Sequence, residues 1–219
     1  ADKENWSVSK ALEYAIDDYA ISLLAKRLEK TDDYELFTKR SKYYANYFDE
    51  KSSFIRGKLA DGTFRKEYNP SFSLHEEADY VEGNGWQYTF MVPHDVLGLI
   101  NLFGSKQKFA EKLDSLFLIG SALNEGASID ISGLIGQYAH GNEPSHSTLY
   151  LYQYADQGYK TAEKVRQVMS EMHKPIPSGL CGNDDCGQMS AWYVMSALGI
   201  YPMNPVNGEF VFGSPVIDK

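Results

Sequence analysis

Three short stretches of the sequence combine acids, amides, glycines and aromatic residues where helical patterns begin or end. They are YVEGNGWQYTF at residues 80–90, QYAHGNEPSH at residues 137–146 and GNDDCGQMSAW at residues 182–192. Hydrolysis of a glycosidic bond needs two separated carboxylates, one acting as an acid and one as a base, and these stretches supply several. The side chains that we consider for such chemistry are Glu82, Asn84, Trp86, Gln87, Gln137, His140, Asn142, Glu143, His146, Asn183, Asp184, Asp185 and Gln188.

Each stretch also has a purely structural interpretation. Glu82 alone would be a solvated loop acid, and Pro144 suits the first turn of a helix. Asp184 and Asp185 would complement the positive N-terminus of the last helix. Because all three stretches lie at junctions between loops and helices, their combination favours one shared pocket over three unrelated surface loops.

Two kinds of ligand fit these residue types. A carboxylate with an amide oxygen beside it suits Ca²⁺, a hard cation that takes oxygen ligands. His140 and His146 lie six positions apart, so they do not share one face of a helix. They either bind sugar hydroxyls or are buried histidines whose hydrogen bonds are satisfied within the protein.

The composition limits the class of protein. The chain has 219 residues, a length that suits one domain with a sizeable core. Its net charge of −9 argues against nucleic-acid binding, which needs clustered lysines and arginines. No apolar run reaches the about 18 residues of a membrane-spanning helix, so we expect no membrane insertion. The 16 Tyr, 11 Phe and 3 Trp indicate a packed helical core, which composition favours, or platforms for sugar rings.

The two cysteines flank the third stretch. Cys181 and Cys186 lack the further Cys or His partners of a zinc site. A disulfide between them would close a very small loop, so we expect free thiols.

Helical periodicity predicts the elements that must position these stretches. Apolar residues recur every three or four positions in residues 7–24 and 31–48, which predicts a helical hairpin. Ser7 or Ser9 is the expected cap of the first helix, and Asp32 with Glu35 resembles a capping box for the second. Further helix pairs are predicted at 92–104 with 105–120, capped by Ser105, and at 145–157 with 159–173, followed by a helix at 187–200.

Loops and one hairpin complete the pattern. Residues 49–81 carry turn signals and form a long loop, which in a compact domain is functional or disordered, and its aromatic residues argue against disorder. The tail at residues 207–217 alternates and contains Asn207-Gly208, which predicts a short β-hairpin. Helix pairs separated by long loops indicate a mainly α fold, a toroid of helical hairpins whose loops gather at one end. A plain helical bundle is the alternative, although bundles have shorter connections.

The sequence resembles glycoside hydrolase family 92 in VEGNGWQYTFMVPHD, HGNEPSH, TLYLY and GNDDCGQMSAWYVMSALGIYP. These are bacterial, Ca²⁺-dependent, exo-acting α-mannosidases that invert the anomeric centre, and the resemblance extends from the first helix to the last residues. Family members are much longer and carry an N-terminal β-sandwich before a barrel of six helix pairs. The resemblance therefore implies that residues 1–219 form a single domain, the C-terminal portion of an incomplete (α/α)6 toroid, with the sandwich and the first helices absent.

The resemblance also implies a role for individual residues. Glu82 matches the general acid, Asp185 the general base, and Asn142 and Glu143 the Ca²⁺ ligands. Asp184 is a further catalytic candidate, at a position where glutamate is common. Asn183 replaces an acid found in some relatives and cannot take a proton, which favours Asp185 as the base. The expected sugar contacts are Trp86, Gln87, His140, His146 and Gln188.

The expected function is hydrolysis of terminal α-linked mannose, on α-1,2 links in mannosides or N-glycans, by an inverting acid–base mechanism with Ca²⁺ as cofactor. The partner is then a mannose-containing oligosaccharide, and the full-length protein is expected in the periplasm, at the cell surface or secreted. The alternative is a catalytically incomplete fragment that binds Ca²⁺ and carbohydrate and self-associates through exposed helix faces. A sugar lyase or epimerase on the same fold fits less well, because such enzymes rely on His, Tyr or Arg as the base.

Overall fold

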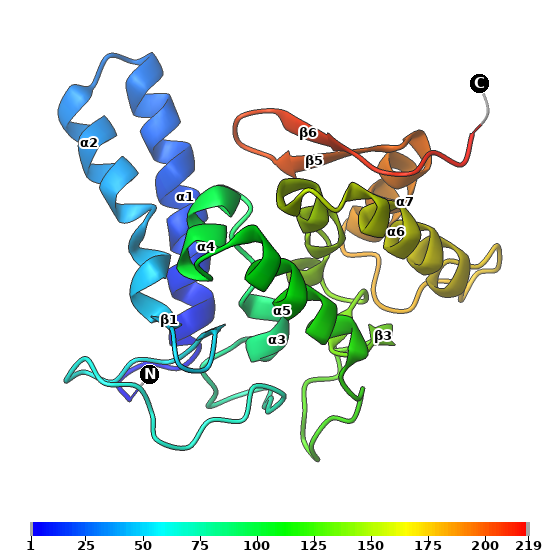
Figure 1. Ribbon diagram of the computed structural model, residues 1–219, viewed down its shortest axis with the longest axis horizontal. Coiled ribbons are helices and arrows are strands. Elements are labelled where there is room, and N and C mark those ends of the chain that lie inside the picture. The colour runs from blue at the N-terminus through cyan, green and yellow to red at the C-terminus, as the bar shows by residue number, and fades with distance from the viewer. Residues whose placement is uncertain (1, 218–219) are drawn as a thin grey trace.

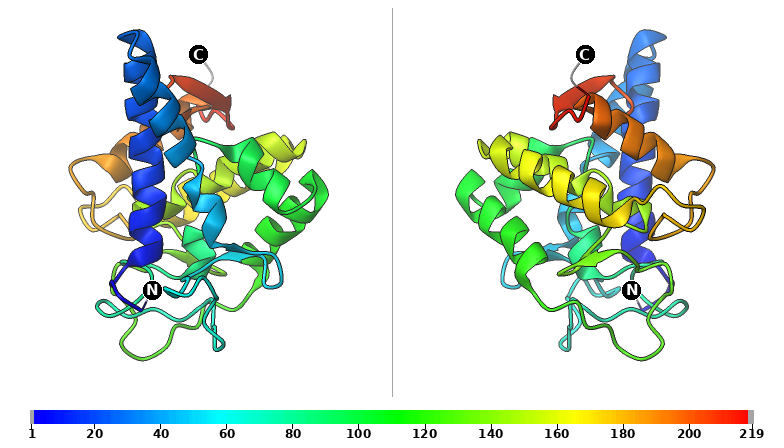
Figure 2. Two further views of the ribbon diagram at one scale, coloured as in Figure 1. Left: turned by 90° about the vertical axis from the view of Figure 1, so that its left-hand side faces the viewer. Right: turned by 90° about the vertical axis from the view of Figure 1, so that its right-hand side faces the viewer.

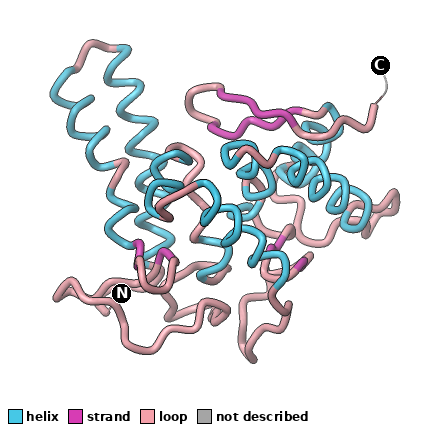
Figure 3. The backbone as a smooth tube through the Cα atoms, viewed as in Figure 1, coloured by secondary structure: helices cyan, strands magenta, loops and turns pink. Residues whose placement is uncertain are grey.

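The computed structural model describes residues 2–217, and most of their regular structure is helical (Figures 1 and 3). The α-helices are α1 Ser7–Arg27, α2 Thr31–Arg40, α3 Gly85–Tyr88, α4 Val96–Leu102, α5 Lys106–Leu118, α6 Gly158–Met172 and α7 Gln188–Leu198. The 3₁₀ helices are η1 Tyr43–Tyr47, η2 Glu143–Ser145 and η3 Thr148–Ala155. Antiparallel pairs join β1 Phe48–Asp49 to β2 Phe54–Ile55, β3 Leu134–Ile135 to β4 Tyr138–Ala139, and β5 Ile200–Asn204 to β6 Glu209–Phe212.

Helices α1 and α2 form the predicted hairpin and stand side by side in every view (Figures 1 and 2). The predicted caps are wrong. The residue before α1 is Trp6, which makes no side-chain cap, and the Ser9 hydroxyl instead accepts the N–H of Val81 at 2.9 Å. The residue before α2 is Lys30, and the predicted capping box does not form. Of the side chains that local sequence suggested as caps, Ser9 is thus engaged in a long-range contact.

The second predicted helix ends earlier than its periodicity indicates. Helix α2 stops at Arg40, and residues 43–47 continue as the 3₁₀ helix η1. The ring of His94 donates from Nε2 to the carbonyl of Ser41 at 2.9 Å, and the Ser41 hydroxyl donates to the carbonyl of Thr38 at 2.8 Å. The Ser41 carbonyl is thus occupied from outside the helix, at the point where α2 ends.

Other elements follow the prediction in position, and one differs in type. Ser105 caps α5 as predicted, with its hydroxyl accepting the N–H of Lys108 at 3.1 Å. The α-helix predicted at residues 145–157 is instead the 3₁₀ pair η2 and η3. Residues 149–152 of η3 are all fully buried, so this segment is packed on every side and has no polar face. The predicted C-terminal hairpin is confirmed as β5 and β6, with Gly208 at φ 72° in the turn.

Most of the aromatic residues lie in the core, as the composition favoured. Tyr150 stacks on Tyr201 with ring centroids 4.2 Å apart, which joins η3 to β5. Phe103, at the end of α4, packs against Phe48 of β1 and Phe109 of α5. These contacts belong to one hydrophobic core, which extends from Val8 and Leu12 of α1 to Tyr201 and Met203 of β5.

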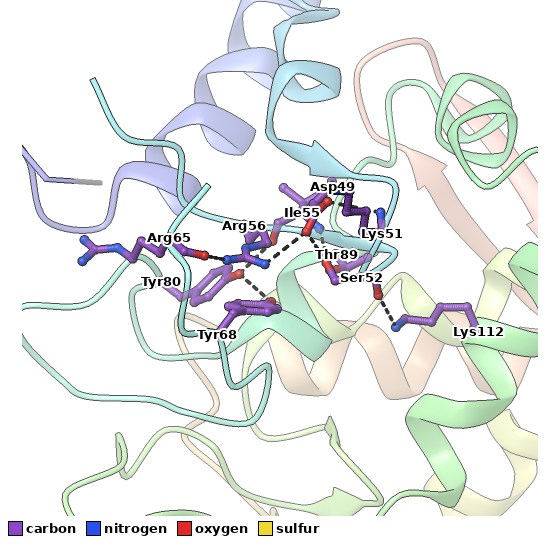
Figure 4. Close-up of polar contacts among 10 residues, drawn as sticks. All are labelled: Asp49, Lys51, Ser52, Ile55, Arg56, Arg65, Tyr68, Tyr80, Thr89 and Lys112. Carbon is purple, nitrogen blue, oxygen red and sulfur yellow. Dashed lines mark hydrogen bonds and ion pairs between the residues drawn. The ribbon is translucent and has the colours of Figure 1, made fainter. Parts of the chain in front are cut away.

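The long loop after β2 is held by a buried arginine (Figure 4). Arg56 donates to the Asp49 carboxylate at 3.1 Å and to the backbone carbonyl of Arg65, and its guanidinium lies 4.2 Å from the ring centroid of Tyr68. The Tyr68 and Tyr80 hydroxyls are 3.0 Å apart, and Tyr80 donates to the carbonyl of Ile55 at 2.7 Å. Contacts inside the protein therefore order the segment that leads to Glu82.

The mainly α class is confirmed, whereas closure of helix pairs into an (α/α)6 ring stays a prediction. Helix α1 packs along α2, and η3 packs along α6, as two clear pairs. Among residues 2–217, no helix is long and apolar enough to cross a bilayer.

Candidate active site

The first polar stretch presents Glu82 from a tightly held turn. The backbone of Val81 is fixed on both sides, because its N–H donates to Ser9 and its carbonyl accepts the Tyr88 hydroxyl at 2.8 Å. Glu82 follows with φ at 49°, a left-handed conformation that costs energy for a residue with a side chain. Asn84 then caps α3 in a reciprocal capping box with Gln87. The acid predicted to protonate the leaving group thus lies in a strained, well-anchored segment.

The second stretch is tied directly to the first. The Asn142 amide donates from Nδ2 to the backbone carbonyl of Glu82 at 2.8 Å. Its Oδ1 accepts the N–H of Glu143 at 3.2 Å, so the same side chain caps η2. A single buried amide therefore fixes the distance between the Glu82 turn and the start of η2, and both acids lie next to it.

The backbone of the third stretch packs closely on the backbone of the second, at Gly182 and Gly141. A Cβ at Gly182 would lie 2.5 Å from the backbone oxygen of Gly141, so only glycine allows the two segments to approach this closely. Asp185, Cys186 and Gly187 then have φ of 44°, 56° and 94°, three left-handed residues in succession. Such strain concentrates at functional sites. It places Asp185 at the tip of the turn that precedes α7.

The adjacent acid, Asp184, accepts hydrogen bonds from the first turn of α7. Its carboxylate accepts the N–H of Ser190 at 2.9 Å and the Ser190 hydroxyl at 3.1 Å. These are contacts to the first turn of α7, where a negative charge is stabilised by the unpaired N–H groups. A direct catalytic role for Asp184 stays a prediction, and its observed contacts are those of the structural interpretation.

The acids of the three stretches influence one another electrostatically. Burial raises the pKa of Glu143, and a hydrogen bond and charge interaction with Asp185 raise it further, as does the charge of Glu82. Burial lowers the pKa of His146 to about 4, against an opposing contribution from the charge of Asp185. Glu82, Glu143 and Asp185 come from three separate loops, yet they lie close enough to share one electrostatic environment.

The two histidines of the second stretch are buried. His140 has no exposed surface, and its Nδ1 and Nε2 lie 2.8 Å from the Tyr138 hydroxyl and from Nε2 of His173. Burial lowers the pKa of His140 to about 2, so the ring is neutral. His146 donates from Nε2 to the carbonyl of His140 at 3.0 Å and accepts the Gln188 amide at 3.3 Å.

Two residues of the first stretch are also engaged inside the protein. Trp86 donates from Nε1 to the Ser71 hydroxyl at 3.2 Å, and Gln87 donates to the carbonyl of Gln137 at 2.6 Å. Both are at most 5% exposed. For Trp86, Gln87 and His140 the structure shows hydrogen bonds inside the protein, and a direct contact with a sugar stays a prediction.

A pocket of about 400 Å³ has Glu143 in its lining, whereas Glu82 and Asp185 are not among its lining residues. Its lining includes Glu143, His146 and Gln188 of the predicted site. It also includes residues that the sequence did not single out: Glu13, Met91, Pro93, Pro144, Ser147, Tyr201, Pro202, Met203 and Pro205. Glu13 follows Ser9 by one turn of α1, and no local sequence signal links it to the site, because Ser9 itself reaches the site only through its contact with Val81.

The donors around Asn142 suit a hard cation in kind. The ligand atoms available from Asn142, Glu143 and Asp185 are oxygens, and the raised pKa of Glu143 beside Asp185 marks a place where a cation would be stabilised. Within residues 2–217, no three His, Cys, Asp or Glu side chains gather as a metal-binding group. Both cysteines are free thiols, as expected.

Comparison with known proteins defines the class of this chain. The model of the glycosyl hydrolase family 92 catalytic domain matches residues 1–219, and the chain belongs to this family. A family GH92 alpha-mannosidase from Bacteroides thetaiotaomicron, solved in complex with mannoimidazole, is 41% identical with a TM-score of 0.93, over 99% of this chain and 29% of that one. A family GH92 inverting mannosidase from Bacteroides thetaiotaomicron VPI-5482 is 33% identical with a TM-score of 0.83, over 98% of this chain and 30% of that one.

A curated relative is an uncharacterized secreted glycosidase from Arthroderma benhamiae, 29% identical over 94% of this chain and 27% of its own length. The chain thus spans less than a third of the length of these relatives.

Proposed function

We propose that this chain carries the acid and base of an exo-acting α-mannosidase, which hydrolyses terminal α-linked mannose with inversion. The observation that carries the proposal is the convergence of Glu82, Glu143 and Asp185 from three loops, in a chain of family 92. Two similar structures are of an α-mannosidase bound to mannoimidazole and of an inverting mannosidase, which supports a mannose-containing substrate.

In this proposal Glu82 protonates the glycosidic oxygen and Asp185 takes a proton from the attacking water. An inverting enzyme keeps its two carboxyl groups far enough apart to admit that water. The fixed Val81 backbone orients Glu82, and the left-handed turn at residues 185–187 orients Asp185. Asp184 holds that turn against α7, and a hydrogen-bonded pair of His146 and Gln188 lines the sugar pocket.

The residues that would hold Ca²⁺ are Asn142 and Glu143. When bound there, the ion would supply positive charge beside the sugar hydroxyls. The protein's own part is to keep these oxygens in place, through the hydrogen bonds from Asn142 to Glu82 and from Glu143 to Asn142. Terminal α-1,2 links of mannosides or N-glycans are the substrates that we propose. Action in the periplasm, at the cell surface or outside the cell is also proposed, in line with the secreted relative.

Proton NMR of the chain with methyl α-1,2-mannobioside and Ca²⁺ tests this function. We expect β-mannose as the first product, and loss of turnover in Glu82→Gln and Asp185→Asn, which keep the shape of each side chain but remove the proton transfer. Turnover by Glu82→Gln at the wild-type rate would exclude Glu82 as the acid. Release of α-mannose as the first product would exclude inversion.

A second function is favoured by one observation. The chain spans less than a third of the length of its relatives, so residues elsewhere in those proteins can complete the reaction. In that case the chain binds Ca²⁺ and mannose without turnover and self-associates. Binding measured without hydrolysis, together with a concentration-dependent mass in light scattering, would favour this alternative.

A further inference from the structure

One carboxylate of the pocket has no role in the function proposed above. Glu13 extends from the second turn of α1 and lines the same pocket as Glu143, His146 and Gln188. It makes no hydrogen bond or ion pair with any side chain in the part of the chain that the structure describes. A glutamate on an exposed helix face is ordinarily in contact with solvent alone. A function for Glu13 therefore has to be argued from its place beside the site.

Helix α1 is built into the site through the residue one turn earlier. Ser9 accepts the N–H of Val81, the residue before Glu82, and residues four apart lie on the same helix face. Glu13 therefore extends from the face of α1 that holds the acid-bearing turn. This arrangement has no local sequence signature, because the contact joins residues 72 positions apart.

The charge of Glu13 also acts on the same group as the site acids. The Tyr88 hydroxyl donates to the carbonyl of Val81. Burial raises the pKa of this hydroxyl, and the charges of Glu13, Glu82 and Glu143 raise it further. Although Glu13 is exposed at the surface, the protein around its carboxyl and the charge of Asp17 raise its own pKa.

The pocket lining indicates which chemistry Glu13 recognises. The lining contains two glutamates, a histidine and a glutamine, over an apolar surface of methionine, proline and tyrosine side chains, and it contains no lysine or arginine. Anionic ligands are disfavoured by such a lining, since it offers two carboxylates and no lysine or arginine side chain to balance a negative ligand. A neutral polyol is favoured, because its hydroxyls donate to carboxylates while its C–H surface packs on apolar side chains.

We propose that Glu13 is a sugar-binding residue, whose carboxylate accepts hydrogen bonds from hydroxyls of a mannoside held in this pocket. The inference rests on the function proposed above and adds a contact from α1, an element that carries none of the residues assigned there. Glu13 contributes to affinity and to the choice of sugar, and the proton transfers remain with Glu82 and Asp185.

Calorimetric titration of the chain with methyl α-mannoside, in buffer with Ca²⁺, tests the inference. The variants are Glu13→Ala, Glu13→Gln and Glu35→Ala, the last a control at an exposed site on α2 with the same change in charge. Glu, Gln and Ala all suit helices, and far-UV circular dichroism checks that each variant folds.

We expect Glu13→Ala to weaken binding about 10-fold or more, the effect of removing a hydrogen bond to a charged group. Glu13→Gln keeps one acceptor oxygen and should be weakened less, while Glu35→Ala should bind as the wild type does. Binding by Glu13→Ala within twofold of wild type would overturn the inference and leave the proposed function standing. Equal weakening in Glu35→Ala would show a general charge effect and overturn it too. No binding by the wild type would overturn both.

Discussion

Replacing Arg56 with methionine is expected to destabilise the chain by about 3–4 kcal/mol, because it leaves a buried carboxylate without its counterion. Arg56 is 7% exposed and its partner Asp49 is 8% exposed, with Nη1 and Oδ2 3.1 Å apart (Figure 4). Methionine fills a similar volume, so the loss is mainly electrostatic. The substitution also removes the bond to the Arg65 carbonyl and the stacking on Tyr68.

The magnitude follows from what remains around Asp49. Breaking a buried ion pair from one side costs about 3–5 kcal/mol. Asp49 keeps the Ser52 hydroxyl at 2.8 Å and the Lys51 N–H at 3.2 Å, which places the cost in the lower part of that range. For a chain of this length the loss corresponds to a fall in Tm of about 10 °C.

Urea unfolding followed by circular dichroism measures the change, with Lys106→Met as the control. Lys106 pairs with Asp156 at 2.8 Å, but both side chains are at least 47% exposed, so we expect a loss of at most about 1 kcal/mol. The double variant Asp49→Asn with Arg56→Met should lose less than the sum of the single variants. If Arg56→Met lost no more than Lys106→Met, the buried pair would not be what holds the loop before Glu82.

Three further outcomes are expected. Gly182→Ala should destabilise by about 1–3 kcal/mol in thermal unfolding, because the new Cβ meets the Gly141 backbone, whereas Gly120→Ala meets no atom within 4 Å and should be neutral. Ser105→Ala should cost about 1 kcal/mol through loss of the α5 cap, and no change in urea midpoint would contradict this. Burial lowers the pKa of His94, so the folded state resists protonation and its free energy of unfolding falls as the pH drops below about 6.5. His94→Gln should remove up to about 1.4 kcal/mol of that fall between pH 7.5 and 5.5, and an unchanged pH dependence would refute the assignment.

Helices that place one apolar face against the core were predictable, since their residues repeat every three or four positions. Helix α6 shows this pattern, and Ser105 marks the start of α5 through a bond three residues along the chain. The type of η3 was not predictable, because residues 149–152 are buried on every side and carry no periodic polar signal. The cap of α1 was wrong because Ser9 bonds to Val81, far along the chain.

The sequence allowed the candidate site residues to be selected, but it did not predict most of the contacts that they make. Glu82, Glu143 and Asp185 stand out because each lies in a stretch that combines acids, amides, glycines and aromatic residues at a junction between a loop and a helix. Their convergence is supported by the raised pKa of Glu143. The contact between buried His140 and His173 was not predictable, because it joins positions 33 apart that share no local pattern. Glu13 was missed because an acid within an amphipathic helix has the same sequence signature as a solvated one.

Whether the three loops form one mannose site is decided by titrating the chain with Ca²⁺ in the presence and absence of mannose, because this measurement does not depend on turnover. We expect saturable Ca²⁺ binding that tightens when mannose is present and is lost in Glu143→Gln. The Glu35→Gln control on α2 should bind as the wild type does. Absence of saturable Ca²⁺ binding by the wild type, or binding that Glu143→Gln leaves unchanged, would contradict the proposed site.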